Sequence, residues 1–260
     1  MTFIGRIRND KSLLADNWFV TAGSITGSEH LRLGRNNQDG VCIDVSERRL
    51  TAVVTDGCSM GRYSEVGARL GARWLASWID AHLDLDGPPD VALHELCEGL
   101  TDHLRLLLRG MRRAPGSDAD LIADYLLFTF LVVTIDRRHA RIFGVGDGFF
   151  AVNGAPTALD PGAGNAPPYI GYTLVEPDRL IDPPPTLSPV LHRVLPTCDV
   201  DSIVIGTDGL ADLEPATLDA LSADDRYLQN PMHLQRQLNV ASRRLADDTT
   251  AVIIRRRSGR

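Results

Sequence analysis

The stretch LTAVVTDGCSMG, residues 50–61, decides how the rest of the chain is organised. It begins with an apolar run rich in β-branched residues and changes abruptly at Asp56, which glycine and other small residues follow. This pattern is typical of a buried strand that carries an acid at its end. Because a lone carboxylate is costly to bury, we expect Asp56 to be solvated, paired or bound to a cation.

Further acids lie at the ends of other predicted strands. The apolar segment SIVIGTDG ends in Asp208, and Asp147 lies within GVGDG. The pair Asp247 and Asp248 precedes a strand predicted over residues 249–254. A single Asp-Gly pair also fits an ordinary tight turn. Several carboxylates that converge without a nearby lysine are instead typical of a hard-cation site, which suits Mg²⁺ or Mn²⁺ better than zinc.

The order of these motifs resembles the metal-dependent protein phosphatases of the 2C type, in their bacterial form. The motifs that carry the resemblance are Asn37-Gln38-Asp39, Thr55-Asp56-Gly57 followed by SEVGAR at 64–69, Gly146-Asp147-Gly148, Thr207-Asp208-Gly209-Leu210 and Asp247-Asp248-Thr249-Thr250. They extend from about residue 21 to 254. We expect one domain over residues 1–260, since no linker divides the chain.

The predicted fold is α+β, because strands are followed by long helices and then by more strands. The resemblance implies a four-layer α/β/β/α sandwich of two antiparallel sheets flanked by helices, with the metals at one end.

The resemblance also implies a set of site residues. Two Mn²⁺ or Mg²⁺ ions would be bound by the catalytic acids Asp56, Asp208 and Asp247 and by the carbonyl of Gly57. Asp247 rather than Asp248 is the expected ligand when Thr250 is aligned with the threonine of that motif. Asp147 would serve a possible third ion, and Asp39 would be an outer-shell acid that holds metal-bound water.

Three positions depart from the family pattern. Gln38 replaces a glutamate that many relatives carry, and Cys58 stands where some carry a histidine proposed as a general acid. The phosphate-binding arginine of relatives falls at Gly34, so we assign substrate binding to the neighbouring Arg35, with Arg32 as the alternative.

The expected function is hydrolysis of phosphoserine or phosphothreonine in proteins by a metal-activated water, without a phosphoenzyme. The partners would be a phosphorylated protein and a serine/threonine kinase acting on the same substrate. One alternative is a catalytically weak adaptor that binds a phosphoprotein. The other is a two-metal hydrolase of small phosphoesters.

A cysteine phosphatase mechanism is a further possibility, because Cys42 and Arg48 have the spacing C-x5-R. Such a phosphate-binding loop needs backbone N–H groups wrapped around the anion, usually through glycines. The intervening residues 43–47 alternate like a strand and contain no glycine, which argues against this mechanism.

The composition restricts partners and location. A formal net charge of −7 argues against nucleic acid or an anionic membrane as a partner. The sequence has no C-x-x-C pair, no signal-peptide pattern at its start and no apolar run long enough for a membrane span. We therefore expect a cytoplasmic protein.

Helical spacing predicts two long helices in the first half. The first begins at Ser64 as N-cap, and its predicted apolar face consists of Val66, Leu70 and Trp74 with Leu75, Trp78 and Ile79. The second covers about 90–111 with a leucine stripe. Shorter helices are expected over about 214–221 and 232–245.

Residues 18–24 are expected to form the first strand, and residues 30–39 a polar loop. The segments 125–136, 139–144 and 149–152 are predicted to form an antiparallel meander. The Pro- and Gly-rich segment 155–189 is expected to contain no long regular element. Tyr169 and Tyr172 in it are candidates for a wall of the substrate site, or for an ordinary surface loop.

Overall fold

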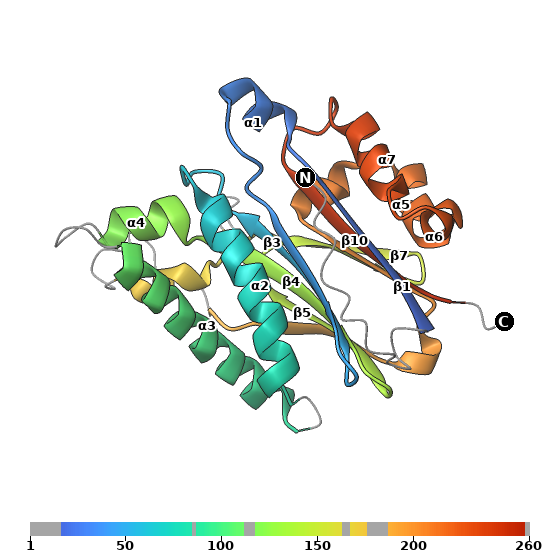
Figure 1. Ribbon diagram of the computed structural model, residues 1–260, viewed down its shortest axis with the longest axis horizontal. Helices are drawn as coiled ribbons and strands as arrows, with labels where there is room; N and C mark the ends of the chain where they lie inside the picture. Colours follow the sequence, from blue (N-terminus) through green and yellow to red (C-terminus); the bar gives the residue numbers. More distant parts are fainter. Residues whose placement is uncertain (1–16, 85–86, 112–117, 163–166, 176–186, 258–260) are drawn as a thin grey trace.

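Two antiparallel five-stranded sheets pack face to face, with helices on both outer faces (Figure 1). The computed structural model describes residues 17–84, 87–111, 118–162, 167–175 and 187–257. The predicted α+β class and the four-layer α/β/β/α sandwich are confirmed.

The first sheet has the strand order β2-β3-β4-β5-β8, and all its pairs are antiparallel. Its strands are β2 (Gly40–Val45), β3 (Leu50–Gly57), β4 (Phe128–Ile135), β5 (His139–Val145) and β8 (Val190–Pro196). The first part of the stretch 50–61 thus forms β3, an inner strand whose last residues include Asp56.

The second sheet has the order β1-β10-β9-β6-β7. Its strands are β1 (Trp18–Ile25), β10 (Thr249–Arg256), β9 (Ser202–Gly206), β6 (Gly148–Val152) and β7 (Ala155–Leu159). β1 pairs with β10 over its whole length, from Trp18 opposite Arg256 to Ile25 opposite Thr249.

The predicted meander is wrong at its third strand, because β6 pairs with β9 and β7 of the second sheet. Between β5 and β6 the chain crosses from one sheet to the other. Gly146 and Gly148 there have φ of 90° and 138°. Residues with a side chain rarely adopt such positive φ angles, so glycine at these two positions permits the crossing.

Helices cover the two outer faces separately (Figure 1). The first sheet is covered by α2 (Ser64–His82), α3 (Pro89–Met111) and α4 (Asp118–Tyr125), and the second by α5 (Pro215–Ala223), α6 (Arg226–Gln229) and α7 (His233–Ala241). The short helix α1 (Ser28–Leu33) lies at one end of the sandwich. Short 3₁₀ helices are η3 (Ile170–Leu174), η5 (Thr197–Asp199) and η6 (Asp208–Asp212).

Several predicted elements differ in extent. The predicted loop 30–39 begins within α1, and α4 occupies the start of the predicted strand 125–136, which begins only at Phe128. The helix predicted to Leu245 ends at Ala241. In the segment 155–189, parts of which lie outside the described residues, β7 and η3 are both short.

The start of α2 was predicted incorrectly. Tyr63 is the N-cap residue, and Ser64 is the first residue of the helix. Val66 and Leu70 are 37% and 44% exposed, so they do not belong to its buried face.

In the first turns, small residues form the buried face of α2: Gly67, Ala68, Gly71 and Ala72. Leu75 and Ile79 are buried as predicted, together with Ala76. A Cβ at Gly71 would lie 2.3 Å from Cζ of Phe128. The absence of a side chain therefore lets α2 approach the first sheet closely.

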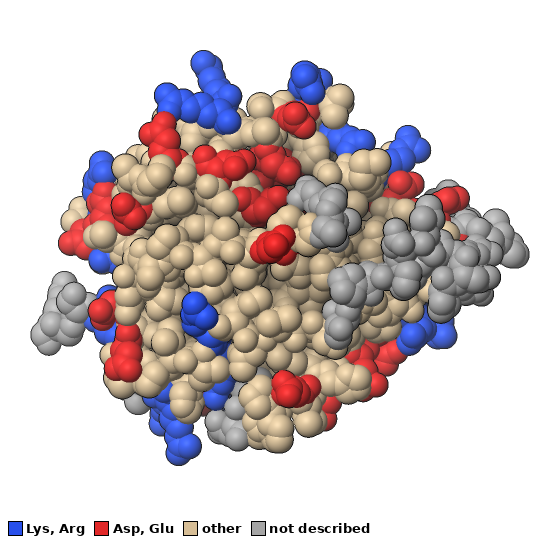
Figure 2. Space-filling view, turned by 180° about the vertical axis from the view of Figure 1, so that it is seen from behind, with Lys and Arg blue, Asp and Glu red and all other residues tan. Residues whose placement is uncertain are grey.

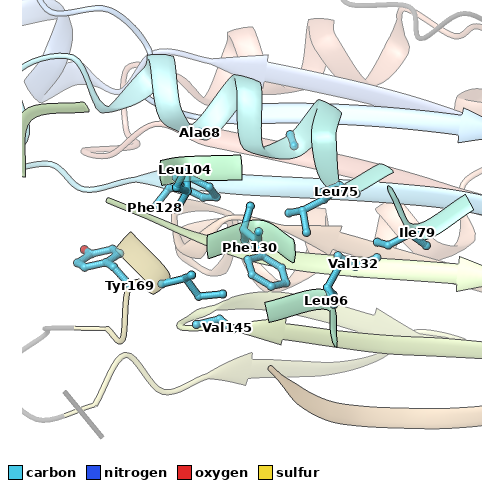
Figure 3. Close-up of a cluster of buried hydrophobic side chains, with 14 of the residues drawn as sticks. Ala68, Leu75, Ile79, Leu96, Leu104, Phe128, Phe130, Val132, Val145 and Tyr169 are labelled. Atoms are coloured by element: carbon cyan, nitrogen blue, oxygen red, sulfur yellow. The ribbon is translucent and has the colours of Figure 1, made fainter. Parts of the chain in front are cut away.

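The apolar core has layers on both sides of each sheet. Between the sheets lie side chains such as Val54, Leu131, Ile205 and Val252. Between the first sheet and its helices lies a second cluster, which includes the predicted leucine stripe of α3 (Figure 3). Burial of this apolar area on both faces stabilises the sheets.

Candidate metal centre

The predicted acids come together, because several of them are electrostatic neighbours of Asp56 and Asp247. Asp248, the residue after Asp247, is hydrogen-bonded to His30 of α1, which lies at one end of the sandwich (Figure 1). Asp56 is the penultimate residue of β3, Asp39 precedes β2, and Asp147 lies between β5 and β6. Asp208 follows β9, and Asp247 precedes β10. Both sheets therefore contribute carboxylates to one site, and Figure 2 shows acidic side chains gathered in the upper part of one face.

Asp56 has the most acidic surroundings. Loss of hydration raises its pKa well above the usual range, and the charges of Asp39, Asp208 and Asp147 raise it further. None of its main electrostatic neighbours in the described chain is a cation. Carboxylates crowded in this way repel one another unless protons or a cation neutralise them.

Asp39 is 3% exposed, and its two oxygens have different surroundings. Oδ2 accepts a 3.0 Å hydrogen bond from Oγ1 of Thr207. Oδ1 is buried and has no hydrogen-bond partner among the described residues. Burial, followed by the charge of Asp248, raises the pKa of Asp39 well above its usual value. Because buried polar atoms are nearly always paired, the bare oxygen fits a site for an ion or its water.

Asp147 and Asp247 belong to the same acidic group. Burial, and then the charge of Asp208, raises the pKa of Asp147 to about 6. The same two causes, in the same order, raise the pKa of Asp247. The set of oxygen donors thus suits a hard divalent cation.

Asp248 differs from its neighbour Asp247. Its Oδ1 accepts a hydrogen bond from the backbone N–H of Gly27 at 2.7 Å. Its Oδ2 accepts from the N–H of Gln38 at 2.6 Å and from Nδ1 of His30 at 2.8 Å. These contacts occupy the Asp248 carboxylate and leave Asp247 as the more available ligand. The sequence analysis missed this role of Asp248 and His30.

The predicted phosphate-binding residue Arg35 lies beside the loop that follows β3. Its Nη1 donates a 2.6 Å hydrogen bond to the carbonyl of Ser59. Nε2 of Gln38 donates to the carbonyl of Gly61 in the same loop at 2.8 Å. Arg69, which sequence analysis did not select, donates to the carbonyls of Asn37 and Asp39. These contacts connect the segment before β2 to the segment after β3.

Tyr169 lies at one end of the core cluster, and its hydroxyl points away from the other labelled side chains (Figure 3). Burial, and then the neighbouring Cys58 and Asp56, raise its pKa. Its ring packs edge-on against Tyr172, with the ring centroids 5.6 Å apart. Tyr169 therefore lies near Asp56 and Cys58, and its role as a wall of the substrate site stays a prediction.

A cysteine nucleophile loop is absent around Cys42, which lies within strand β2. Burial raises the pKa of its thiol, whereas a cysteine nucleophile needs a lowered pKa.

The family model for Protein phosphatase 2C matches residues 26–248. The chain belongs to the protein phosphatase 2C family. This family is one of metal-dependent phosphatases that act on phosphorylated proteins. A comparison with curated proteins finds no match.

Solved structures share the fold. A bacterial serine phosphatase bearing an arginine-to-lysine mutation has a TM-score of 0.64 at 14% identity, with 93% of this chain and 98% of that chain covered. Serine/threonine phosphatase Stp1 from Staphylococcus aureus has a TM-score of 0.61 at 14% identity, covering 92% and 95%. The Mycobacterium tuberculosis phosphatase PstP/Ppp has 0.55 at 18%, covering 92% and 98%.

RsbX, solved in complex with magnesium, has a TM-score of 0.53 at 12% identity and covers 93% of this chain and 96% of its own. Within the described ranges, no helix combines the length and apolarity needed to cross a membrane.

Proposed function

We propose that this protein is a metal-dependent phosphatase that hydrolyses phosphoserine or phosphothreonine in proteins, with Mn²⁺ or Mg²⁺ as cofactor. The observation that carries this proposal is the convergence of acids from both sheets around Asp56, whose main electrostatic neighbours among the described residues include no cation. The bare, buried Oδ1 of Asp39 supports it.

Each acid has a proposed role. Two ions would be bound by Asp56, Asp208 and Asp247 with the carbonyl of Gly57, and a third, weaker ion by Asp147. Asp39 would accept a hydrogen bond from water through its free oxygen. Bound ions of this kind lower the pKa of water and neutralise phosphate charge.

Other residues of the chain would orient the substrate. Arg35 is partly exposed beside the loop after β3, where its guanidinium could also reach a phosphate. Cys58 is a poor substitute for a histidine general acid, so solvent would protonate the leaving alkoxide. Tyr169 would limit access from the side of η3.

We further propose that residues 1–260 act as a single catalytic domain in the cytoplasm. The substrate would be a phosphorylated protein, and a serine/threonine kinase would act on the same substrate. The net charge of −7 supports a protein partner rather than nucleic acid or an anionic membrane.

One observation favours the adaptor alternative. Gln38, which replaces a glutamate of many relatives, uses its amide to hold Gly61. Its buried Oε1 has no partner among the described residues. An adaptor would bind phosphopeptide without turnover. A hydrolase of small phosphoesters would prefer sugar phosphates or nucleotides to phosphopeptides.

The test measures hydrolysis of p-nitrophenyl phosphate and of phosphoserine and phosphothreonine peptides, with Mn²⁺ or with EDTA. We expect activity with Mn²⁺, loss of activity in EDTA and in Asp208→Asn, and little inhibition by vanadate. Asp219→Asn on the exposed face of α5 is the matched control and should remain active. Activity that survives EDTA but disappears in Cys42→Ser would overturn the mechanism.

A further inference from the structure

The Asp248 side chain is a buried connection between three segments that are distant in sequence. It is 2% exposed. Its donors are the N–H of Gly27 after β1, the imidazole of His30 in α1 and the N–H of Gln38 before β2. Three of the roughly four acceptor positions of this carboxylate are thus occupied, and hydrogen bonds to a charged group are the strong ones.

The segment around Gly27 also packs against the backbone of Asp247. Ser28 and Glu29 donate backbone hydrogen bonds to the carbonyls of Leu245 and Ala246, at 3.0 and 3.1 Å. A Cβ on Gly27 would lie 2.3 Å from the carbonyl carbon of Asp247. The start of α1 therefore determines where the Asp247 backbone lies.

On its other side, Asp248 acts on Asp39 through the backbone. The Asp248 carboxylate accepts a hydrogen bond from the backbone N–H of Gln38, which immediately precedes Asp39. The carboxylate of Asp39 is in turn held by Thr207. One buried carboxylate thus connects the segment carrying the proposed ligand Asp247 with the segment carrying the outer acid Asp39.

A direct metal site on His30, Asp247 and Asp248 is the competing interpretation, because one ligand atom from each lies within 4.8 Å of the others. An ion there would have to replace the 2.8 Å hydrogen bond between His30 and Asp248. It would also compete with two backbone donors for the same carboxylate. The existing bonds favour positioning over coordination.

We propose that His30 and Asp248 are a positioning pair that orients Asp247 and Asp39 for metal binding without touching the metal. This inference rests on the proposed function, since it assigns a task to residues beside the proposed ligands. Partners that orient metal ligands typically contribute 10- to 100-fold to affinity.

The chemistry of the pair suggests matched variants. Asp248→Asn replaces one acceptor oxygen with a donor amide, which would face an N–H or the imidazole. His30→Phe keeps an aromatic ring but removes the donor to Asp248. His30→Gln keeps a side-chain donor and serves as the conservative rescue.

The experiment measures Mn²⁺ affinity and stoichiometry by calorimetry, after a thermal melt in EDTA has shown that each variant is folded. We expect Asp248→Asn and His30→Phe to weaken Mn²⁺ binding about 10- to 100-fold with the number of sites unchanged. His30→Gln should retain most of the wild-type affinity, and Asp219→Asn all of it. If Asp248→Asn does not fold, the two His30 variants decide the question.

Three outcomes would overturn the inference. Lower melting temperatures with unchanged Mn²⁺ affinity would make the pair purely structural. Loss of one Mn²⁺ equivalent in both Asp248→Asn and His30→Phe would make the pair ligands. Equal loss in His30→Phe and His30→Gln would show that the donor is irrelevant. Asp247→Asn separates this inference from the proposed function. If Asp247→Asn binds Mn²⁺ with unchanged affinity, the metal centre itself is contradicted. If Asp247→Asn binds Mn²⁺ more weakly but the His30 and Asp248 variants do not, only the positioning pair is contradicted.

Discussion

The hydroxyl of Thr207 donates a 3.0 Å hydrogen bond to Oδ2 of Asp39, two residues 168 positions apart in the chain. Thr207 follows β9 of the second sheet, and Asp39 precedes β2 of the first. The same hydroxyl accepts the N–H of Thr250 at 3.0 Å. One buried side chain therefore connects the ends of both sheets beside the acidic group.

Thr207→Val should destabilise the protein, because it leaves Asp39 without this donor and the N–H of Thr250 without its acceptor. An unpaired buried polar group costs about 1–3 kcal/mol. Thr207→Ser keeps the hydroxyl and should lose less. Urea denaturation of both variants in EDTA measures the difference. A loss in Thr207→Val no larger than that in Thr207→Ser would contradict the role of the hydroxyl.

Asp56→Asn should stabilise the metal-free protein, because it removes the central charge from a cluster of repelling carboxylates. It should also abolish the stabilisation by Mn²⁺, which at 100 times Kd amounts to about 2.7 kcal/mol per site. Thermal melts of wild type and variant, each in EDTA and in Mn²⁺, test the two halves separately.

Two results of these melts would contradict the role of Asp56. A lower melting temperature for the variant in EDTA would make Asp56 a structural turn residue. A full Mn²⁺ increment in the variant would show that Asp56 does not bind the ions.

The metal-free protein should gain stability from Asp147 as the pH falls. The pKa of Asp147 is about 6 in the folded state against 3.8 for a free side chain. The folded state thus holds this proton more tightly, so its contribution to stability increases from about pH 7 down to 4 and is lost as pH rises through 6. A shift of this size corresponds to about 3 kcal/mol.

Asp147→Asn removes this titration, so its stability in EDTA should exceed that of wild type at pH 7.5, with the advantage shrinking toward pH 4. Denaturation at several pH values measures this. With Mn²⁺, the variant should keep both tight sites and turn over more slowly, because Asp147 is assigned to the third ion. Calorimetry that finds the tight sites lost would assign Asp147 to them.

Gly27→Ala should weaken Mn²⁺ binding, because the added Cβ would lie 2.3 Å from the carbonyl carbon of Asp247 and must displace that backbone. Overpacking of this kind typically costs about 1–3 kcal/mol. Gly110→Ala is the control, since a Cβ there meets no atom within 4 Å. Calorimetry should show weaker Mn²⁺ binding, and thermal melts a lower melting temperature, only for Gly27→Ala. An unchanged Mn²⁺ affinity in Gly27→Ala would show that Gly27 does not act on the metal site.

Arg35→Ala should raise KM for a phosphopeptide more than it lowers kcat, if the guanidinium binds phosphate equally in the ground and transition states. Steady-state kinetics at saturating Mn²⁺ measures both constants. Unchanged kinetics would restrict Arg35 to its contact with Ser59 and transfer the test to Arg32.

The ends of the inner strands could be predicted from the sequence because the signal is local. An apolar run that stops at an acid defines both the strand and the side chain at its end, as at Asp56 and Asp208. Their convergence was predicted from the order of family motifs, and the structure brings the acids together. Their roles toward metal remain a prediction.

The packing of α2 and the role of Asp248 could not be predicted in the same way. Helical spacing allowed more than one apolar face, and the close approach of Gly71 to Phe128 selects the face of small residues. The donors to Asp248 lie 210 to 221 positions away in the sequence. No local pattern reports such contacts, because they depend on how both sheets assemble.

The pairing of β1 with β10 has a consequence for synthesis. Among the strands of the described residues, β1 is made first and β10 last, and β10 lies between β1 and β9. Until the ribosome has released residues 249–256, β1 has no strand partner and β9 presents an unpaired edge. Open edges of this kind promote aggregation. A chain that terminates before residue 247 would lack both β10 and the proposed ligand Asp247, and its open strand edges would make it prone to aggregate.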